Sequence, residues 1–423
     1  MNSWLRETFV SLRVPAYRVL WLSVLLNFAA LWASIVSRGF LAFDLTDSAA
    51  ALGALFLGFG LPMLVLGPLG GVIADRWPRK TVTVVAQWSF AATNTVIAVL
   101  VLTDVIEFWM LFAGAISEGA GVALGIPARQ ALIGDLVEED DIGNAVALQQ
   151  VSFNGVRIIA PTLAGVLIAV DAVGIGGVFL LQSVGYAAAA LVAMRLPTAA
   201  PRPSEEHVSP LASIIQGVRY VRSRPAILTL VLFAYAIELT AFTYAVFIPA
   251  VVGDLFDGGS IALGVMTTAI ALGAFAASLP VAWLADRTSG WTFHLLSALV
   301  FGPLLIVFAL SPVYALALAI GIGLGAAETG FLSMNQSLAM RFSHRDYYGR
   351  VQSVLLFGFA LNGLVGFPVG VIADIVGLRP TMVGLGVASS VLVLVVLLYS
   401  RRIDARSDAL RPAEAAAKQP TSL

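Results

Sequence analysis

Five charged side chains stand five or more residues from either end of a long apolar run in this chain, where a charge needs a chemical reason. They are Arg38, Glu118, Arg157, Glu238 and Glu328. A charge at the middle of a bilayer costs roughly 2.5–3.5 kcal/mol on insertion scales, and such residues mark ion or substrate paths. Counted at about 1.5 Å per residue, four of them fall near the middle of their runs, and Arg38 lies in the outer third of the first.

These side chains could handle protons or bind a charged substrate. We expect Glu238, and with it Glu118, to take up and release a proton or to bind a cationic group, because an apolar cavity favours the neutral form of a carboxylate. Arg38 and Arg157 could equally bind an anionic substrate. The alternative for Glu118 and Arg157, on consecutive runs, is a buried ion pair that only fixes packing. Glu328 is a further candidate, and the polar neighbours expected in the same cavity are Asn154, Tyr235 and Asn335.

The elements that must position these charges are membrane helices. Of the 423 residues, 59% are hydrophobic and 12% are charged, against roughly a quarter charged in soluble domains, and the mean hydropathy is +0.93. Apolar runs of about 20 residues, each long enough to cross about 30 Å of hydrocarbon, recur along the chain. We expect twelve transmembrane helices, at 17–43, 50–74, 81–103, 107–132, 144–170, 174–195, 226–252, 260–284, 291–311, 313–340, 350–373 and 379–400.

Charges outside these runs predict the division and orientation of the chain. A polar linker at 196–225 separates an N-terminal six-helix bundle (1–195) from a C-terminal one (226–400). Apolar residues at helical spacing within the linker predict an amphipathic helix at the membrane surface, and 401–423 are expected to form a disordered cytoplasmic tail. Because Arg and Lys gather on the side of the N-terminus, we expect both termini in the cytoplasm and the chain in the inner membrane.

A charged loop occurs twice. The segment 70–80 reads Gly-Gly-Val-Ile-Ala-Asp-Arg-Trp-Pro-Arg-Lys, and 279–287 is a diluted copy of it half a chain later. Pro161 in the fifth run likewise corresponds to Pro368 in the eleventh. Two six-helix halves related by parallel duplication are typical of secondary transporters, whose site lies at the interface between the halves. The expected fold is therefore an all-α polytopic membrane protein with two pseudo-symmetric bundles.

The first loop resembles the signature between helices two and three of the major facilitator superfamily, written G-x-L-a-D-R-x-G-R-K. Pro78 stands where that pattern prefers glycine. The similarity covers residues 15–400, and Pro127–Val137 and Tyr348–Val351 further resemble the branch that contains the enterobactin exporter and drug exporters. The matching positions of the loop are Gly71, Ala74, Asp75, Arg76, Arg79 and Lys80.

This resemblance implies a gate at the cytoplasmic side. Asp75 would lie against the N-terminus of the eleventh helix near Gly349, where the helix dipole favours a carboxylate. Arg79 would pair with Asp135 at the end of the fourth helix, and Asp286 would play the mirrored role of Asp75. The alternative is that these charges only set topology. The gate residues implied are Gly71, Asp75, Arg76, Arg79, Lys80, Asp135, Asp286, Arg287, Gly349 and Arg350.

The chain departs from the proton-coupling pattern of the efflux pumps in this superfamily. Their fourth helix carries R-x-x-Q-G-x-G, whereas this chain has Ala115 in place of the arginine and Glu118 in place of the glutamine. The glycines, Gly119 and Gly121, match. The proton-antiport scheme of those pumps therefore does not carry over residue by residue.

We expect a monomeric secondary transporter working by alternating access, and specifically a proton-coupled exporter of a small amphipathic molecule such as a drug or siderophore. One alternative is a uniporter or lipid or metabolite facilitator whose charges never titrate; another is a non-transporting membrane scaffold or sensor. The sequence lacks a phosphate-cradling loop, metal-spaced His or Cys and a nucleophile elbow. We therefore expect no enzymatic activity, cofactor or metal, and the net charge of −1 predicts no nucleic-acid partner.

Overall fold

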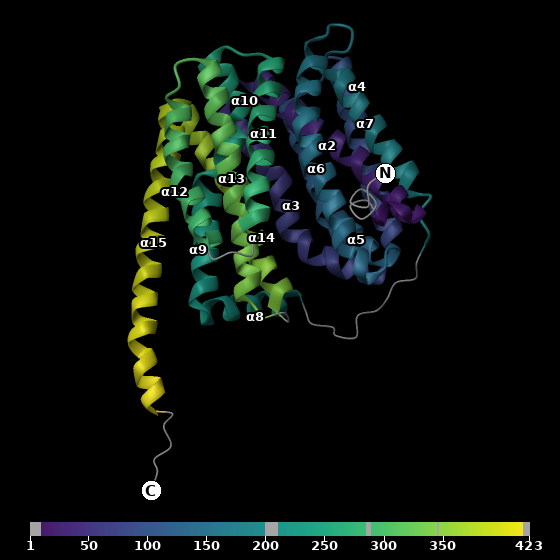
Figure 1. The fold of residues 1–423 in the computed structure, drawn as a ribbon. Helices are drawn as coiled ribbons and strands as arrows, with labels where there is room; N and C mark the ends of the chain where they lie inside the picture. Colours follow the sequence, from purple (N-terminus) through teal and green to yellow (C-terminus); the bar gives the residue numbers. More distant parts are fainter. Residues whose placement is uncertain (1–9, 199–209, 285–288, 345–346, 418–423) are drawn as a thin grey trace, which may run out of the picture.

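The described chain is a bundle of long helices (Figure 1). The computed structural model describes residues 10–198, 210–284, 289–344 and 347–417, and no strand occurs among them. Eleven helices in these ranges are long and apolar enough to cross a membrane, and α14 adds a shorter apolar stretch, Leu361–Val376. The expected all-α membrane fold is confirmed.

The helices divide into two sets joined by α8. The first set consists of α2 (Pro15–Thr46), α3 (Ala49–Arg76), α4 (Arg79–Leu102), α5 (Phe108–Leu136), α6 (Ile142–Ala169) and α7 (Gly174–Ala193). A helix at Pro210–Ser223, α8, occupies the region where the sequence predicts an amphipathic helix. The second set consists of α9 (Pro225–Thr240), α10 (Ile248–Ala250), α11 (Ser260–Leu284), α12 (Ser289–Ala309), α13 (Tyr314–Phe342), α14 (Tyr348–Val376) and α15 (Leu378–Ala417).

Figure 1 shows the two sets side by side, with α3 of the first and α14 of the second between them. These two helices pack on each other, and α6 packs on α11. We call the end of the bundles that carries α8 the linker end and the opposite end the far end. Because α3 runs toward the linker end and α14 runs away from it, the two central helices are antiparallel.

The seventh span is not one continuous α-helix, although the sequence predicts a single run at 226–252. The α-helix α9 ends at Thr240, a 3-10 stretch covers Phe242–Phe247, and α10 leads into a π-helical stretch at Val251–Leu255. Pro249 lies within this irregular segment and has no backbone N–H to give to a helical ladder. The break places Glu238 in the last turn of α9.

The C-terminal segment differs from its prediction. The helix α15 continues to Ala417 and projects past the other helices at the linker end (Figure 1). The structure describes helix over 401–417, where the sequence predicts a disordered tail, and 418–423 lie outside the described residues. Alanine, arginine and glutamate are strong helix formers, and extending an existing helix avoids the cost of nucleating a new one.

Glycines bring helix backbones into direct contact in both bundles. A Cβ added to Gly119 of α5 would overlap the carbonyl oxygen of Phe59 in α3, and one on Gly325 of α13 would overlap that of Ile270 in α11. Close backbone approach of this kind drives helix association in membranes, where burial of apolar surface contributes little.

We expect Gly119→Val to destabilise the first bundle, because the added side chain forces α5 away from α3. Overpacking of this kind costs about 1–3 kcal/mol or more. The measurement is the midpoint of thermal unfolding of the purified protein in detergent. Gly134→Val is the matched control, since it adds the same side chain to α5 at a position with open space around it. Equal midpoints for the two variants would contradict the packing role of Gly119.

Candidate functional site

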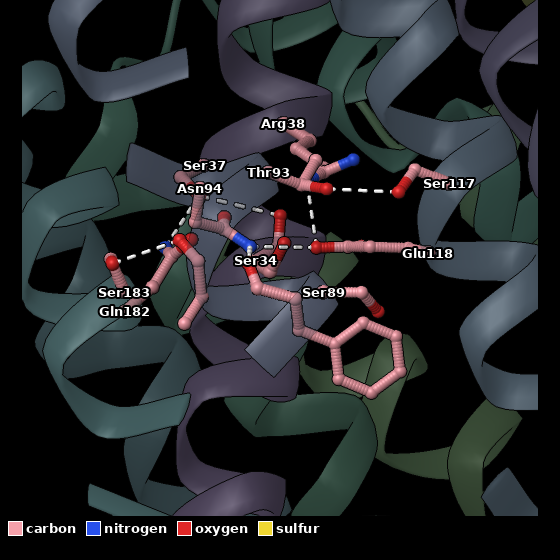
Figure 2. A network of polar contacts seen from close by, with 12 residues as sticks. Ser34, Ser37, Arg38, Ser89, Thr93, Asn94, Ser117, Glu118, Gln182 and Ser183 are labelled. Atoms are coloured by element: carbon pink, nitrogen blue, oxygen red, sulfur yellow. Dashed lines mark hydrogen bonds and ion pairs between the residues drawn. The ribbon is translucent and has the colours of Figure 1, made fainter. Parts of the chain in front are cut away.

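Arg38 and Glu118 form a buried ion pair inside the first bundle (Figure 2). The distance from Arg38 Nη2 to Glu118 Oε1 is 2.6 Å, and Glu118 is only 4% exposed. Asn94 of α4 donates its side-chain N–H to the same oxygen at 2.9 Å. On the next helix, Gln182 of α7 donates to Ser37 Oγ at 2.7 Å. Four helices are thus tied together by polar contacts at one depth in the bundle.

The alternative pairing of Glu118 with Arg157 is wrong. Arg38 lies about 12 Å from the far end of α2, and Glu118 about 15 Å from the far end of α5, so the two charges have nearly the same depth. Depth does not separate the two candidates, because Arg157 lies about 18 Å from the far end of α6. The helices α5 and α6 follow each other in the chain, but α5 packs mainly on α3 and α4, and α6 on α2 and α11. Arg157 instead reaches the second bundle.

The pair between Arg157 of α6 and Glu328 of α13 crosses the interface between the bundles. Arg157 Nη2 lies 3.2 Å from Glu328 Oε1. The hydroxyl of Tyr244 donates to the other carboxylate oxygen at 3.5 Å. On the opposite side, the guanidinium carbon of Arg157 is 5.1 Å from the ring centroid of Trp32, a cation–π distance. This cluster couples the two bundles near mid-membrane.

Glu238 has no basic partner among the described residues. It is 5% exposed, and its Oε2 has no hydrogen-bond partner. Asn362 of α14 is the hydrogen-bonding neighbour of its carboxyl group. Tyr235, one turn away, donates its hydroxyl to the Val354 carbonyl at 2.6 Å and thereby ties α9 to α14. A buried carboxylate without a cation is a strong candidate for protonation.

Asn335 and Asn154 are the remaining polar candidates for the site. Asn335 of α13 is buried, and its side-chain oxygen has no partner. Asn154 of α6 is partly exposed.

At the linker end, the predicted pair of Arg79 with Asp135 is present. Arg79 Nη1 lies 2.7 Å from Asp135 Oδ1 and also donates to the Ala131 carbonyl at 3.3 Å. Lys80 donates to the Leu196 carbonyl at 2.6 Å, just past the end of α7. The loop after α3 is therefore fastened to α5 and α7 within its own bundle.

The expected contacts of that loop with the second bundle are only partly visible. Asp286 and Arg287 lie outside the described residues. The structure also does not describe the contacts of the Asp75 side chain or of Gly349. Of the other gate candidates, Gly71 and Arg76 are exposed. Arg350 places its guanidinium carbon 5.0 Å from the ring centroid of Tyr347.

The far end carries a contact that the sequence analysis did not predict. Asp374, at the end of α14, caps the N-terminus of α3 in the other bundle. Its carboxylate accepts from Ser48 Oγ at 2.6 Å, from the Ala49 N–H at 2.7 Å and from the Ala50 N–H at 3.1 Å. A carboxylate at a helix N-terminus satisfies free N–H groups and matches the helix dipole.

A sequence signal for this contact existed. Residues 370–374 read Gly-Val-Ile-Ala-Asp, and 71–75 read the same five residues. Because α3 and α14 are antiparallel, each helix ends in this sequence beside the N-terminal end of the other. The position expected for Asp75 at the linker end and the observed position of Asp374 at the far end are therefore mirror counterparts.

Close packing accompanies this cap at the far end. A Cβ on Gly53 of α3 would overlap the carbonyl oxygen of Gly366 in α14. The helices α6 and α11 also contact each other across the interface between the bundles. Ser260 Oγ of α11 donates to the Gly165 carbonyl of α6 at 2.9 Å, and Thr268 Oγ1 of α11 donates to the Ile158 carbonyl of α6 at 2.8 Å. Two helix pairs thus join the bundles on this side.

A cavity of about 480 Å³ lies among the helices of the first bundle. It extends from Thr83, about one turn from the linker end of α4, to Glu118. That volume lies within the range of small-molecule sites. The polar and charged side chains lining it are Asn27, Thr83, Gln87, Glu118, Arg129, Gln130, Gln149, Gln150 and Tyr186.

Three bacterial membrane transporters are similar to this chain in sequence. The uncharacterized MFS-type transporter YfiS of Bacillus subtilis is 30% identical over 192 residues, 44% of each chain. The staphyloferrin A transporter of Staphylococcus aureus is 23% identical over 90% of this chain and 95% of its own. The enterobactin exporter EntS of Escherichia coli is 26% identical over 74% of each.

Solved structures agree in fold. A bacterial homologue of the human lysosomal transporter Spinster, in an inward-facing and unoccupied conformation, superposes with a TM-score of 0.72 at 18% identity, covering 92% of this chain and 97% of its own. The nucleoside transporter NupG gives 0.74 at 14% identity, covering 90% and 99%. The family described as transmembrane secretion effector matches residues 6–421. The chain therefore belongs to this family of major facilitator superfamily transporters, and is not an enzyme.

Proposed function

We propose that the protein exports a small amphipathic molecule from the cytoplasm by alternating access, in exchange for protons. The observation that supports this proposal is the asymmetry of the molecule. Two helix pairs and the Asp374 cap join the bundles at the far end, whereas a polar cavity begins about one turn from the linker end. A transporter waiting for substrate from the linker side would have this arrangement.

In this proposal the linker end faces the cytoplasm and the protein lies in the inner membrane. The linker end carries Arg76, Arg79 and Lys80 after α3, and basic residues are retained on the cytoplasmic side. Both described chain ends, at the start of α2 and beyond the last span in α15, are then cytoplasmic. The enterobactin exporter among the relatives supports the outward direction.

Opening the far end requires the cap on α3 to break. Asp374 would leave Ser48 and the free N–H groups of α3, and Asp75 would take the equivalent place at the N-terminus of α14 on the other side. The two aspartates would then stabilise opposite states of one rocking motion, each with the same kind of contact.

Glu238 is the proposed proton carrier. The other embedded carboxylates, Glu118 and Glu328, each lie within 4 Å of an arginine and are already paired. Glu238 has no such partner in the described chain, so no arginine fixes its charge as the transporter opens to one side or the other. The alternative is a uniporter or a lipid or metabolite facilitator, in which the embedded charges never titrate.

We expect Asp374→Asn to shift the protein toward opening at the far end, because the amide loses the charge that matches the helix dipole. The loss of charge-assisted hydrogen bonds corresponds to about a tenfold change in the open fraction. Since the chain has no cysteine, Leu52→Cys provides a single buried reporter in α3. Its rate of reaction with a membrane-impermeant maleimide measures the opening.

Asp171→Asn, an exposed carboxylate at the same end, is the control on the same cysteine background. Its labelling rate should match that of the parent. A labelling rate unchanged by Asp374→Asn would show that the cap does not hold the far end closed.

We expect Glu238→Gln to abolish uphill transport while leaving exchange intact, since glutamine imitates the protonated carboxyl but cannot release a proton. The assay is accumulation in inverted, respiring vesicles, with enterobactin, staphyloferrin A and ethidium as probes. Accumulation by the variant should fall to that of vesicles without the protein. Counterflow of preloaded probe should continue.

Glu139→Gln, an exposed carboxylate at the linker end, should accumulate like the wild type. Protonophore-sensitive accumulation by Glu238→Gln would remove this residue from coupling. Accumulation by the wild type that resists a protonophore would favour the uniporter.

A further inference from the structure

Arg129 is a cation without a carboxylate partner in the cavity of the first bundle. It lies on α5, lines the cavity and is partly exposed to it. Among the described residues no acidic oxygen lies within 4 Å of its guanidinium, and its Nε has no hydrogen-bond partner. Its close contact is with an aromatic ring, since the guanidinium carbon is 5.0 Å from the Phe28 centroid.

The lack of a carboxylate partner distinguishes Arg129 from the other arginines that contact the interior of the first bundle. Arg38 and Arg157, the arginines first expected to bind an anionic substrate, each form an ion pair with a glutamate. Arg79 forms an ion pair with Asp135. A cation held in a low-dielectric site is costly unless something neutralises it, and the cavity offers the space for a mobile partner.

The charge of the cavity points to the sign of that partner. Of the lining residues, only Glu118 and Arg129 are charged. Glu118 is already neutralised by Arg38 at 2.6 Å. The cavity therefore carries the net positive charge of Arg129, which attracts an anion and disfavours a cation.

Two buried amides, Gln149 of α6 and Gln87 of α4, add hydrogen-bonding groups to the lining of the cavity. Gln149 is 7% exposed, lines the cavity, and its side-chain Nε2 has no partner. Gln87 donates to Ser23 Oγ at 2.9 Å, which leaves its Oε1 free. A buried N–H donor without a hydrogen-bond partner destabilises the ligand-free protein, and a ligand oxygen would accept a hydrogen bond from it.

Aromatic rings form the apolar part of the cavity. Phe28 packs edge-on against Phe153 with centroids 4.9 Å apart, and Phe90 lies 5.2 Å from Tyr186. All four line the cavity. Such faces accept a flat ring in offset or edge-to-face contact.

We propose that Arg129, with Phe28 beside it, binds the anionic group of an aromatic substrate, a carboxylate or a phenolate. The ring of that substrate lies among the four aromatic side chains, and Gln149 donates to one of its oxygens. This inference rests on the proposed function, because it names the chemical class of what the transporter carries. It assigns the anion to Arg129 instead of to Arg38 or Arg157.

The test uses the purified full-length protein in nanodiscs, without any gradient, and two probes of nearly equal shape. Salicylate carries a carboxylate on a ring, and salicylamide replaces that group with a neutral amide. We expect the wild type to bind salicylate more tightly, measured by calorimetry. Arg129→Gln should remove about a 10-fold to 100-fold preference for the anion, the range expected for one charge-assisted contact, while Arg129→Lys should retain part of it.

Two further variants separate this role from a structural one. Phe28→Leu should weaken both probes and leave their ratio nearly unchanged, because it alters the ring contact and not the charge. Arg219→Gln removes an exposed arginine of α8 and should behave like the wild type. Arg129→Gln should also keep or raise the thermal midpoint, since it deletes a cation that no residue neutralises.

Equal affinity of the wild type for the two probes, or no binding of either, would overturn the proposal. So would a preference for salicylate that survives in Arg129→Gln. The result is independent of the transport assay: selective binding without accumulation in vesicles would refute export while leaving the anion site established. Export of the siderophore probes without selective binding of salicylate would refute the anion site while leaving export established.

Discussion

The structure depends on one constraint, that a charge inside hydrocarbon must meet an opposite charge or a cavity. Arg38 and Glu118 satisfy it within the first bundle and hold α2 to α5. Arg157 and Glu328 satisfy it between the bundles, so that the interface itself is built on an ion pair. Because breaking a buried pair costs several kcal/mol, roughly 3–5 where it has been measured, rocking of the bundles must either keep this second pair or hydrate it. By the same rule, Glu238 and Arg129 need a partner that moves, since neither has an oppositely charged side chain within 4 Å among the described residues.

The second feature that organises the molecule is the antiparallel pair of α3 and α14. Glycines such as Gly53 let their backbones touch, which makes the pair a stiff axis between the bundles. The five-residue sequence that ends in Asp75 in one helix ends in Asp374 in the other. If Asp75 caps α14 in the other state as Asp374 caps α3 here, one sequence motif would supply a similar cap for each state. Similar caps would keep the two states close in free energy, as reversible alternation requires.

Much of the fold follows from the sequence, since runs of about 20 apolar residues allow little except spanning helices. The Arg79–Asp135 pair was also predictable, because the family resemblance places Arg79 against an acid at the end of the fourth helix, where Asp135 stands. The partner of Glu118 could not be predicted in this way, since helices that follow each other in the chain, such as α5 and α6, pack mainly on other helices. Asp374 was missed although its motif repeats that of Asp75, because the comparison of halves aligned equivalent helices and not antiparallel neighbours. Helix continuation to Ala417 shows propensity prevailing over polar composition.

The sign of the substrate charge bears on the energy source. With the linker end in the cytoplasm, a substrate anion leaves a compartment that is electrically negative, and each 100 mV contributes about 2.3 kcal/mol per charge in that direction. An anion bound at Arg129 would therefore be driven outward even without proton exchange. Proton entry through Glu238 would add a second contribution of the same sign, because a positive charge moving inward and a negative charge moving outward both follow the potential. For a cation the two terms would oppose each other, and the proton would be indispensable. The sign of the substrate charge that Arg129 selects therefore decides whether transport needs the proton carried by Glu238.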